Sequence, residues 1–468
     1  MLDSSKSGAA EAHRQTLTAA PSLATADILA ARRARLCASV SEGAVVIVPG
    51  AAMVSRNADV EHDFRQDSDF FYLTGFDEPD ALAVLRPGRD PGFVLFVRPS
   101  DPDAETWTGR RAGLAGARAR FGADAAYDVG ALDSELPRLL EGATSIQWVF
   151  GRDERRDAAY IRAAQHHWRT PRVGAVGPNR YEDLRPTLHE LRLRKAPEEI
   201  ASLRRAARIT AEGHHEAMRL AAAGRWEYEL AAVMEMVFRV SGSQRNGYPS
   251  IVAGGDNATI LHYNTNRMRL EGGALVLIDA GAEFGYHTAD VTRTFPVDGR
   301  FSPAQRDVYA IVLAAEEASI ALTRAGTTYL AAHECSVRML TQGLVDLGVL
   351  SGSVDGLIET EAFKPWFMHR TGHWLGMDVH DVGLYANSGA PRLLEVGMVT
   401  TVEPGLYFAA HDERVPVALR GIGVRIEDDV LVGEDGPDVL SIDCVKAIDD
   451  VEAICAEAPL WIDRRRLS

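Results

Sequence analysis

The sequence predicts an α+β protein with a smaller α/β domain at the N-terminus and a larger α+β domain after it. Three observations support this prediction. Short β-patterned runs alternate with helical patterns over the first 185 residues, whereas longer helices separate the strands that follow. The chain has 468 residues, which is enough for two or more domains. Its hydrophobic fraction of 46% is ordinary for a globular protein and excludes a disordered or fibrous chain.

The first 185 residues are expected to contain a tail and one domain. Residues 1–27 are rich in Ala, Ser and Thr without periodicity, which predicts a flexible tail. Residues 28–185 form the predicted N-terminal α/β domain. We expect helices at 28–36 and 132–140, and strands at 44–49, 81–85, 93–97 and 146–150.

Residues 186–468 are expected to form one large α+β domain. A long helix should run from residue 196 to about residue 222, with Pro197 in its first turn. Ser302 is the N-cap of a capping box that begins a second helix, which should end before Gly326. Strands are expected at 274–279, 291–295, 398–403 and 423–432.

The composition excludes several classes of function. Lys and Arg number 50 against 66 Asp and Glu, a formal net charge of −16, whereas a nucleic-acid binder needs a basic face. No apolar run reaches the roughly 20 residues of a transmembrane helix. The four cysteines lie far apart without a CxxC pair, which fits a reducing compartment. We therefore expect a cytoplasmic protein with neither a nucleic acid nor a membrane as its partner.

Two aspartates in the segment LVLIDAGAEFGYHTADVTRTF predict a cation site. Asp279 and Asp290 flank a turn, and a two-residue hairpin loop at Phe284-Gly285 would place them directly opposite each other on one face. Two carboxylates so close repel each other, and the apolar strand beside them adds a desolvation cost unless a cation lies between them. The alternative is a pair of solvated turn aspartates.

Three histidines lie within twelve residues in the segment FMHRTGHWLGMDVH. His369, His373 and His380 suit one imidazole metal ligand with neighbours that handle protons. A single histidine there would more often be a core residue with satisfied hydrogen bonds, whereas three together favour a site. His214 and His215, by contrast, are expected on the surface of the first long helix.

Two glutamates lie inside apolar β-patterned runs, Glu403 in TVEPG and Glu427 in GVRIEDD. An unpaired carboxylate is costly in such a position. Arg425 would share a strand face with Glu427, because the two residues are two positions apart. A structural Arg–Glu ion pair is the alternative for these two residues.

Taken together, these segments supply four carboxylates and one imidazole. Such a hard, oxygen-rich set suits two divalent ions, Mn²⁺, Co²⁺, Zn²⁺ or Fe²⁺, about 3.5–4 Å apart. Four carboxylates balance the charge of two such ions, and a water between the ions would ionise readily. The expected chemistry is hydrolysis with a metal-held water as the nucleophile.

The same segments resemble those of the pita-bread metallopeptidases, family M24. The ordered pattern DAG…DVTRTFP…HRTGHWLGMDVHD…TVEPGLY…GVRIEDD covers nearly the whole second half of the chain. Two N-terminal stretches, FRQDSDFFYLTGFDEPDA and WTGRRAG, are similar to the aminopeptidase P group, and the resemblance spans roughly residues 44–455. It implies a C-terminal pita-bread domain, two metal ions with Mn²⁺ first among the candidates, and release of the N-terminal residue from peptides with proline second.

The resemblance also implies a role for each metal ligand. Asp279 is similar to the chelating ligand of one metal, and Asp290 and Glu427 to the two bridging carboxylates. His373 and Glu403 resemble the remaining ligands of the other metal. Glu403 is also similar to the group that accepts a proton from the nucleophilic water.

Five further residues resemble groups that handle the substrate. His262, in the segment LHY, is similar to a histidine beside the scissile bond, and His369 lines the same pocket. His380 and Arg425 resemble groups that hold the substrate and the tetrahedral oxyanion. Trp107 resembles an aromatic that packs on the proline ring, and its alternative is an ordinary core indole.

Two alternatives to this function stay open, and a third, a metal-free enzyme of similar fold, fails because this chain keeps a carboxylate-rich set of ligand residues. Prolidase cleaves only Xaa-Pro dipeptides with the same metal centre, and the FYLTGF and WTGRR stretches favour the aminopeptidase. A non-catalytic pita-bread binding protein typically lacks metal ligands, whereas this chain keeps all five. Creatine amidinohydrolase is similar in fold but works without metal.

The resemblance further implies peptides with N-terminal Xaa-Pro as substrates and a homodimer or homotetramer. One residue departs from the family pattern. Arg370 stands where many relatives have a small residue, and its side chain either narrows the pocket mouth or points to solvent.

Overall fold

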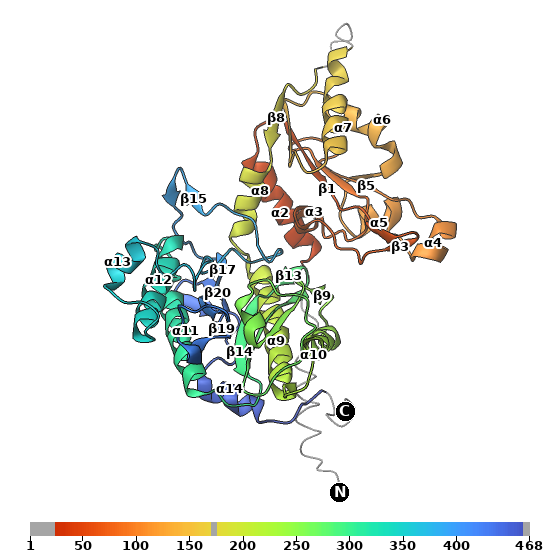
Figure 1. Cartoon of the computed structure of the whole chain (residues 1–468). Coiled ribbons are helices and arrows are strands. Elements are labelled where there is room, and N and C mark those ends of the chain that lie inside the picture. Colours follow the sequence, from red (N-terminus) through yellow and green to blue (C-terminus); the bar gives the residue numbers. More distant parts are fainter. Residues whose placement is uncertain (1–23, 170–175, 462–468) are drawn as a thin grey trace. The chain divides into compact units, whose positions relative to one another are not determined.

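The structure is a computed structural model that describes residues 24–169 and 176–461 (Figure 1). The described chain forms two compact units, which meet in the sequence between Leu191 and Arg192. Helix α8 (Arg185–Leu193) spans this boundary. The sequence had predicted the boundary between residues 185 and 186, a few residues earlier. Residues 1–23, which hold most of the predicted tail, lie outside the described residues.

The first unit is built on a six-stranded mixed sheet in the order β6-β5-β4-β1-β7-β8. β1 (Ala44–Pro49) pairs antiparallel with β4 and parallel with β7, and its apolar side chains are buried. Helices α6 (Leu132–Leu139) and α7 (Glu154–Gln165) pack on the face that carries Val45 and Ile47. The other elements are α2 (Ala26–Ser39), β2 (Ser55–Asn57), β3 (Val60–Glu61), α3 (Ser68–Thr74), β4 (Leu82–Leu85), β5 (Phe93–Val97), α4 (Pro102–Thr108), α5 (Gly113–Ala119), β6 (Ala125–Asp128), β7 (Ser145–Trp148) and β8 (Arg180–Asp183).

The second unit combines small antiparallel sheets with long helices around one large core (Figure 1). Its helices are α9 (Pro197–Leu220), α10 (Glu227–Val240), α11 (Pro303–Leu322), α12 (Tyr329–Asp346), α13 (Val354–Glu359) and α14 (Ile448–Cys455). Its strands are β9 (Arg245–Asn246), β10 (Ile251–Gly254), β11 (Leu275–Ala280), β12 (Ala282–Phe284), β13 (His287–Thr288), β14 (Val291–Pro296), β15 (Ala386–Asn387), β16 (Ala390–Pro391), β17 (Val399–Val402), β18 (Gly405–Phe408), β19 (Ile422–Arg425), β20 (Asp428–Val432) and β21 (Pro437–Val439). Three of the sheets have the orders β10-β11-β14, β17-β20-β21 and β18-β19, and together they carry the site described below.

The predicted elements are largely confirmed, including both long helices of the second unit. α11 begins with the predicted capping box: Ser302 Oγ accepts a hydrogen bond from the Gln305 N–H (3.4 Å), and Gln305 Oε1 accepts one from the Ser302 N–H (2.9 Å). α9 begins at Pro197. Two glutamates in its first turn stabilise the helix, because their negative charges lie at the positive end of the helix dipole.

The hairpin that carries the two aspartates differs from the prediction by one residue at its turn. The loop is Gly285-Tyr286, with φ of 58° and 67°, as a type I′ turn requires. Asp279 therefore lies opposite Thr292, and the prediction that it directly faces Asp290 is wrong. Both loops put an aromatic residue at positive φ, Phe284 in the predicted loop and Tyr286 in the observed one, so residue type does not decide between them. The shift moves each partner by two positions, so both aspartates keep the predicted face.

The strand predicted at 423–432 is two strands, β19 and β20. Between them, the Glu427 N–H leaves the ladder and donates to the Thr292 carbonyl (3.1 Å). β19 pairs with β18, whereas β20 pairs with β17. Arg425 consequently ends β19 and Glu427 lies in the break that follows, so the two do not share one face of one strand.

His214 and His215 are buried, so the prediction of surface histidines is wrong. His214 Nε2 lies 3.3 Å from the Ala280 carbonyl oxygen, and His215 Nε2 accepts a hydrogen bond from the Val445 N–H (3.2 Å). The C-terminal half of α9 is buried on nearly all sides, whereas an amphipathic pattern predicts one exposed face.

The buried His214 is expected to make the fold sensitive to acid. Burial, and then the charge of Arg293, lowers the pKa of His214 from 6.5 to about 4. The unfolded chain binds a proton below about pH 6.5, which the folded protein resists, so folding stability should fall by up to about 3 kcal/mol between pH 6.5 and pH 4. Thermal unfolding should depend less on pH in a His214→Gln variant over this range. Equal slopes in the two proteins would contradict this account.

Candidate metal centre

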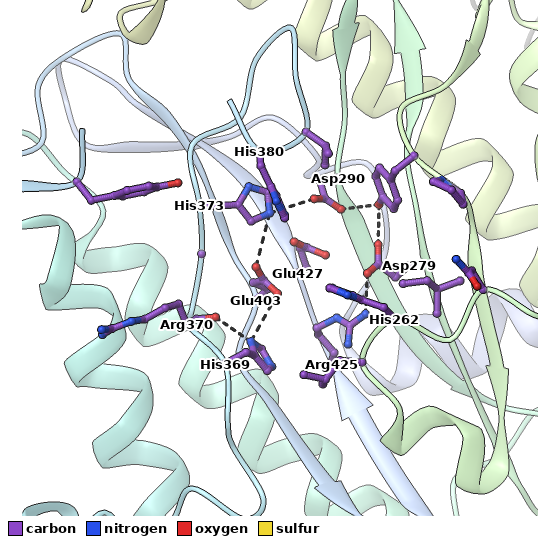
Figure 2. A pocket seen from close by; sticks show the side chains of 18 of the residues that line it. His262, Asp279, Asp290, His369, Arg370, His373, His380, Glu403, Arg425 and Glu427 are labelled. Atoms are coloured by element: carbon purple, nitrogen blue, oxygen red, sulfur yellow. Dashed lines mark hydrogen bonds and ion pairs between the residues drawn. The ribbon is translucent and has the colours of Figure 1, made fainter. Parts of the chain in front are cut away.

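The second unit contains a cavity of about 700 Å³ that brings together nine of the predicted site residues (Figure 2). All five predicted metal ligands line it: Asp279, Asp290, His373, Glu403 and Glu427. Four predicted substrate residues line it too: His262, His369, His380 and Arg425. The four carboxylates and the imidazole of His373 point toward one another from different segments of the chain (Figure 2).

Strand ends place the four carboxylates. Asp279 lies in β11 one residue before its end, and Asp290 directly precedes β14. Glu403 directly follows β17, and Glu427 lies in the break between β19 and β20. Four segments far apart in the sequence therefore meet because the antiparallel sheets bring their ends to one place.

His373 is held in one orientation by backbone contacts. Its carbonyl accepts from the Thr401 N–H (2.9 Å), and its own N–H donates to Thr401 Oγ1 (3.0 Å). Nδ1 lies 3.1 Å from the Trp374 carbonyl oxygen, which can only accept, so Nδ1 carries a proton. Nε2 faces the carboxylates, 3.3 Å from Asp290 Oδ2 and 3.7 Å from Glu403 Oε1. This arrangement leaves Nε2 as the atom that would ligate a metal.

The electrostatics of the cavity fit a cation site. Within the described residues, Asp290, His373 and Glu427 offer ligand atoms that all lie within 4.8 Å of one another. Burial, and then neighbouring negative charge, raises the pKa of Asp290 and of Glu427. Burial raises the pKa of Glu403 to about 7, against the attraction of His373 and Arg425. Buried carboxylates that lie this close have raised pKa values because their negative charges repel one another. A divalent cation between them would remove that repulsion, so the arrangement favours a cation site.

Arg425 pairs with an aspartate rather than with Glu427, so the alternative of a structural Arg–Glu pair is wrong. Its Nη2 donates to Asp279 Oδ2 (2.6 Å), its Nε to Thr292 Oγ1 (3.0 Å) and its Nη1 to Tyr407 Oη (3.2 Å). The Thr292 hydroxyl in turn donates to Glu427 Oε2 (2.6 Å). Arg425 is 3% exposed, so the guanidinium is a fixed positive charge at the base of the carboxylate cluster.

The three other histidines surround this cluster. Burial, and then the charge of Arg425, lowers the pKa of His369 to about 4, so its ring is neutral near pH 7. His369 Nε2 lies 2.8 Å from Tyr407 Oη. The His380 ring packs edge-on against His373 with centroids 4.2 Å apart. His262 is exposed and lies on the side of Asp279 and Arg425 (Figure 2).

Tyr248 is a site residue that was not predicted. Its hydroxyl lies 2.6 Å from Asp279 Oδ1 and 2.5 Å from Asp290 Oδ1. Desolvation of the hydroxyl and the charges of both aspartates raise the pKa of Tyr248 well above 10, so the phenol keeps the proton that it donates. It lies in the loop NGYPS between β9 and β10, where a lone tyrosine carries no pattern that would have identified it.

Replacing Tyr248 with phenylalanine is expected to weaken metal binding about 10–100-fold, because the two aspartates lose the donor that orients them. Calorimetric titration of the metal-stripped protein with Mn²⁺ would measure this loss. Tyr309→Phe is the matched control, since the Tyr309 hydroxyl donates to the Lys446 carbonyl outside the cavity (2.7 Å). Equal Mn²⁺ affinity in Tyr248→Phe and the control would contradict the prediction.

Two residues singled out in the sequence lie elsewhere or at the margin. Trp107, in α4 of the first unit, is 89% exposed and is not among the residues that line the cavity, so the alternative of a core indole is wrong. Arg370 is exposed and lines the cavity, and its side chain extends away from the predicted metal ligands (Figure 2).

Comparison with known proteins agrees with this geometry. Residues 201–434 match metallopeptidase family M24. The Xaa-Pro aminopeptidase of Escherichia coli strain K12 is 43% identical over 429 residues, which are 91% of this chain and 97% of that protein. The chain belongs to metallopeptidase family M24. Residues 29–148 of this M24 metallopeptidase match the N-terminal domain of aminopeptidase P.

Two solved structures show the same fold over both domains. Aminopeptidase PepP of Pseudomonas aeruginosa is 45% identical with a TM-score of 0.91, over 92% of this chain and 98% of that one. Aminopeptidase P from E. coli with the inhibitor Pro-Leu is 42% identical with a TM-score of 0.89, over 93% of this chain and 99% of that one. The M24 metallopeptidase therefore has a C-terminal pita-bread domain preceded by a smaller α/β domain, as the sequence predicted.

Proposed function

We propose that this M24 metallopeptidase is an Xaa-Pro aminopeptidase, which hydrolyses the peptide bond between an N-terminal residue and a proline in second position. The observation that carries the proposal is the convergence of five metal-ligand side chains, three further histidines and one arginine on a single cavity. Relatives that match over nearly their whole length bear the same activity in their names. A bond to proline has no N–H and a rigid ring, so its hydrolysis calls for a dedicated site.

Two divalent cations, Mn²⁺ first among the candidates and Zn²⁺, Co²⁺ or Fe²⁺ as the others, are the proposed cofactors. Asp279, Asp290 and Glu427 would hold one ion, and the last two would bridge to a second ion held also by His373 and Glu403. When bound, such ions polarise the scissile carbonyl and lower the pKa of a water nucleophile. The hard oxygen-rich donor set supports this choice over a soft metal.

The side chains around the ligands have proposed roles of their own. Glu403, which lines the cavity beside His373, would accept the proton of the attacking water. The fixed charge of Arg425 would stabilise the developing oxyanion, and the neutral His369 would line the same pocket. His262 and His380, both exposed at the cavity, would hold the peptide on either side of the scissile bond.

The domain assignment, the location and the assembly are proposals as well. Residues 28–185 would form the aminopeptidase P-type N-terminal domain and residues 186–468 the catalytic domain. Four unpaired cysteines support a cytoplasmic location, and no helix in the described part of the chain is long and apolar enough to span a membrane. An indole as exposed as Trp107 favours contact with the substrate ring or with another copy of the chain. Light scattering should give two or four times the 50.9 kDa of one chain.

Product analysis by mass spectrometry tests the function. Metal-stripped and Mn²⁺-loaded enzyme would be offered Gly-Pro, Gly-Pro-Ala and, as a control, Gly-Ala-Ala. We expect Gly and Pro-Ala from the proline tripeptide only when metal is present, and no cleavage of the control. Cleavage of Gly-Pro alone would make the protein a prolidase. No cleavage of any peptide with any of the four metals would favour a non-catalytic binding protein.

A further inference from the structure

His262 is carried by a loop with little regular structure. This loop, residues 254–268, begins at the end of β10 and contains one short 3-10 turn (Gly255–Thr259), after which no helix or strand is present up to residue 268. Among the described residues, no side chain forms a hydrogen bond with the His262 ring, which is exposed at the cavity (Figure 2). The position of His262 therefore depends on what holds residues 254–268, which we name the His262 loop.

One buried carboxylate binds the His262 loop at four points. Glu227, the first residue of α10, has no exposed surface. Its Oε1 accepts hydrogen bonds from the Gly254 N–H and from Asn257 Nδ2, both at 2.9 Å. Its Oε2 accepts from the Tyr263 hydroxyl and from the Met268 N–H, both at 2.8 Å. The four donors lie at both ends of the loop and inside it.

Glu227 has no cationic partner in the described chain, unlike most of the buried acids of this unit. Buried Asp428, for comparison, pairs with Arg293 and Lys446. A buried charge without a counter-charge is costly, and an apolar residue of similar size would fill the same space more cheaply. Four hydrogen-bond donors and a place in the first turn of a helix surround the carboxylate instead. All four donors belong to the His262 loop. The buried carboxylate therefore serves to hold that loop in one conformation.

The contact through Tyr263 bears most directly on His262. Tyr263 follows His262 in the chain, and its ring packs with Ala258, Leu277 and other residues of a small apolar cluster while its hydroxyl reaches Glu227. Anchoring the ring of one residue inward leaves its neighbour to face the cavity. The backbone strengthens this attachment, since the Glu227 N–H donates to the Met268 carbonyl (3.0 Å).

We propose that Glu227 is a positioning residue of the peptidase, which holds the His262 loop in the one conformation that presents His262 to the scissile bond. The inference rests on the proposed function for the role of His262, but the attachment of the loop to Glu227 does not. Glu227 does not line the cavity and touches neither substrate nor metal. Its effect on hydrolysis therefore passes through His262.

A double-mutant cycle with Glu227→Gln and His262→Ala tests this role. Glutamine has the size of glutamate, but its amide nitrogen replaces one of the two oxygens and cannot accept hydrogen bonds. Two of the four hydrogen bonds to the loop are therefore lost. Because displacement of a reacting-site group by about 1 Å can cost about 100-fold in rate, kcat/KM for Gly-Pro-Ala should fall about 100-fold in Glu227→Gln. In the His262→Ala background the same change should have no further effect on kcat/KM. An equal fall in both backgrounds would overturn the proposal.

Glu216→Gln is the matched control. Glu216 is also fully buried and accepts hydrogen bonds from the backbone N–H groups of Leu460 and Trp461 (3.0 and 2.8 Å), outside the cavity and the His262 loop. It should lower the melting temperature without changing kcat/KM. If Glu227→Gln does not fold, Tyr263→Phe removes one of the four bonds and leaves the charge in place. That variant should show a smaller fall in kcat/KM that also disappears in the His262→Ala background, and a fall that persists there would overturn the proposal.

Hydrogen exchange separates this proposal from the proposed function. In Glu227→Gln the amide hydrogens of Gly254 and Met268 should exchange faster, while those of β11 remain protected. Unchanged exchange in a folded Glu227→Gln variant would overturn the attachment of the loop, whatever the activity. Wild-type protein that cleaves no peptide, together with faster exchange in the variant, would instead refute the proposed function and leave the attachment supported.

Discussion

Asp290→Asn is expected to lower kcat/KM on a proline tripeptide about 1000-fold and at the same time to make the metal-free protein more stable. Loss of the proposed bridging carboxylate would remove several kcal/mol of metal-dependent stabilisation of the transition state, and about 4 kcal/mol corresponds to three orders of magnitude. In the metal-free protein, however, Asp290 lies among carboxylates that repel it, and burial together with the charge of Asp279 raises its pKa. A neutral amide removes that repulsion.

Peptide cleavage and thermal unfolding with and without Mn²⁺ check both halves of this prediction. Wild-type protein should gain melting temperature on Mn²⁺ addition, and Asp290→Asn should not. Asp438→Asn, in an exposed pair with Arg204, serves as a charge-matched control and should keep both the activity and the Mn²⁺ shift. A variant that loses activity but retains the full Mn²⁺ shift would show that Asp290 is not a ligand.

Asp428→Asn is expected to destabilise the protein, in contrast to Asp290→Asn. The free energy of unfolding should fall by about 3–5 kcal/mol. Asp428 is fully buried, accepts from Arg293 Nη2 (2.7 Å) and Lys446 Nζ (2.5 Å), and also from the Ser441 hydroxyl (2.7 Å). Although burial opposes it, the charges of Arg293 and Lys446 lower the pKa of Asp428, so it is ionised in the folded protein. Removal of its charge leaves two cations in the interior with one remaining carboxylate, that of Glu316.

Chemical denaturation measures the loss directly, and a drop of about 8 °C in melting temperature is expected for a domain of this size at about 4 kcal/mol. The same Asp438→Asn variant provides the exposed comparison, for which a change within about 1 kcal/mol is expected. Mn²⁺ affinity of folded Asp428→Asn should stay near the wild-type value, because Asp428 does not line the cavity. Similar losses of stability in Asp428→Asn and Asp438→Asn would contradict the conclusion that Asp428 belongs to a buried network of ion pairs.

Glu427 and Asp428 show a limit of prediction from the sequence, because it could not tell which of two adjacent carboxylates lines the cavity from residue type alone. Adjacent in one motif, they lie on either side of a boundary between the cavity and a buried ion-pair network. The resemblance singled out Glu427 alone. Nothing in the residue types distinguishes the two carboxylates, since the difference is that Glu427 lies in the break before β20 whereas Asp428 begins β20 and pairs with buried cations.

The pattern of apolar runs, caps and turn residues determined most of the elements by itself. The capping box at Ser302 and the strands at 44–49 and 93–97 were predictable because local backbone preference and burial agree there. The hairpin turn was misplaced by one residue because either loop puts an aromatic residue at positive φ, and only the surrounding packing decides that this residue is Tyr286. The burial of His214 was missed for a related reason, since it depends on elements that meet α9 from distant parts of the chain.

The sequence by itself determined which chemistry this protein can support, because four carboxylates and a histidine in ordered motifs define a donor set whatever their exact geometry. Only the tertiary structure decided how these groups are held. Tyr248 bridges two aspartates, Arg425 pairs with Asp279, and Glu227 binds the His262 loop, each across a separation of at least 27 residues. Contacts of that kind leave no periodicity in the chain. They arise where strand ends and loops are brought together by the packing of the whole domain.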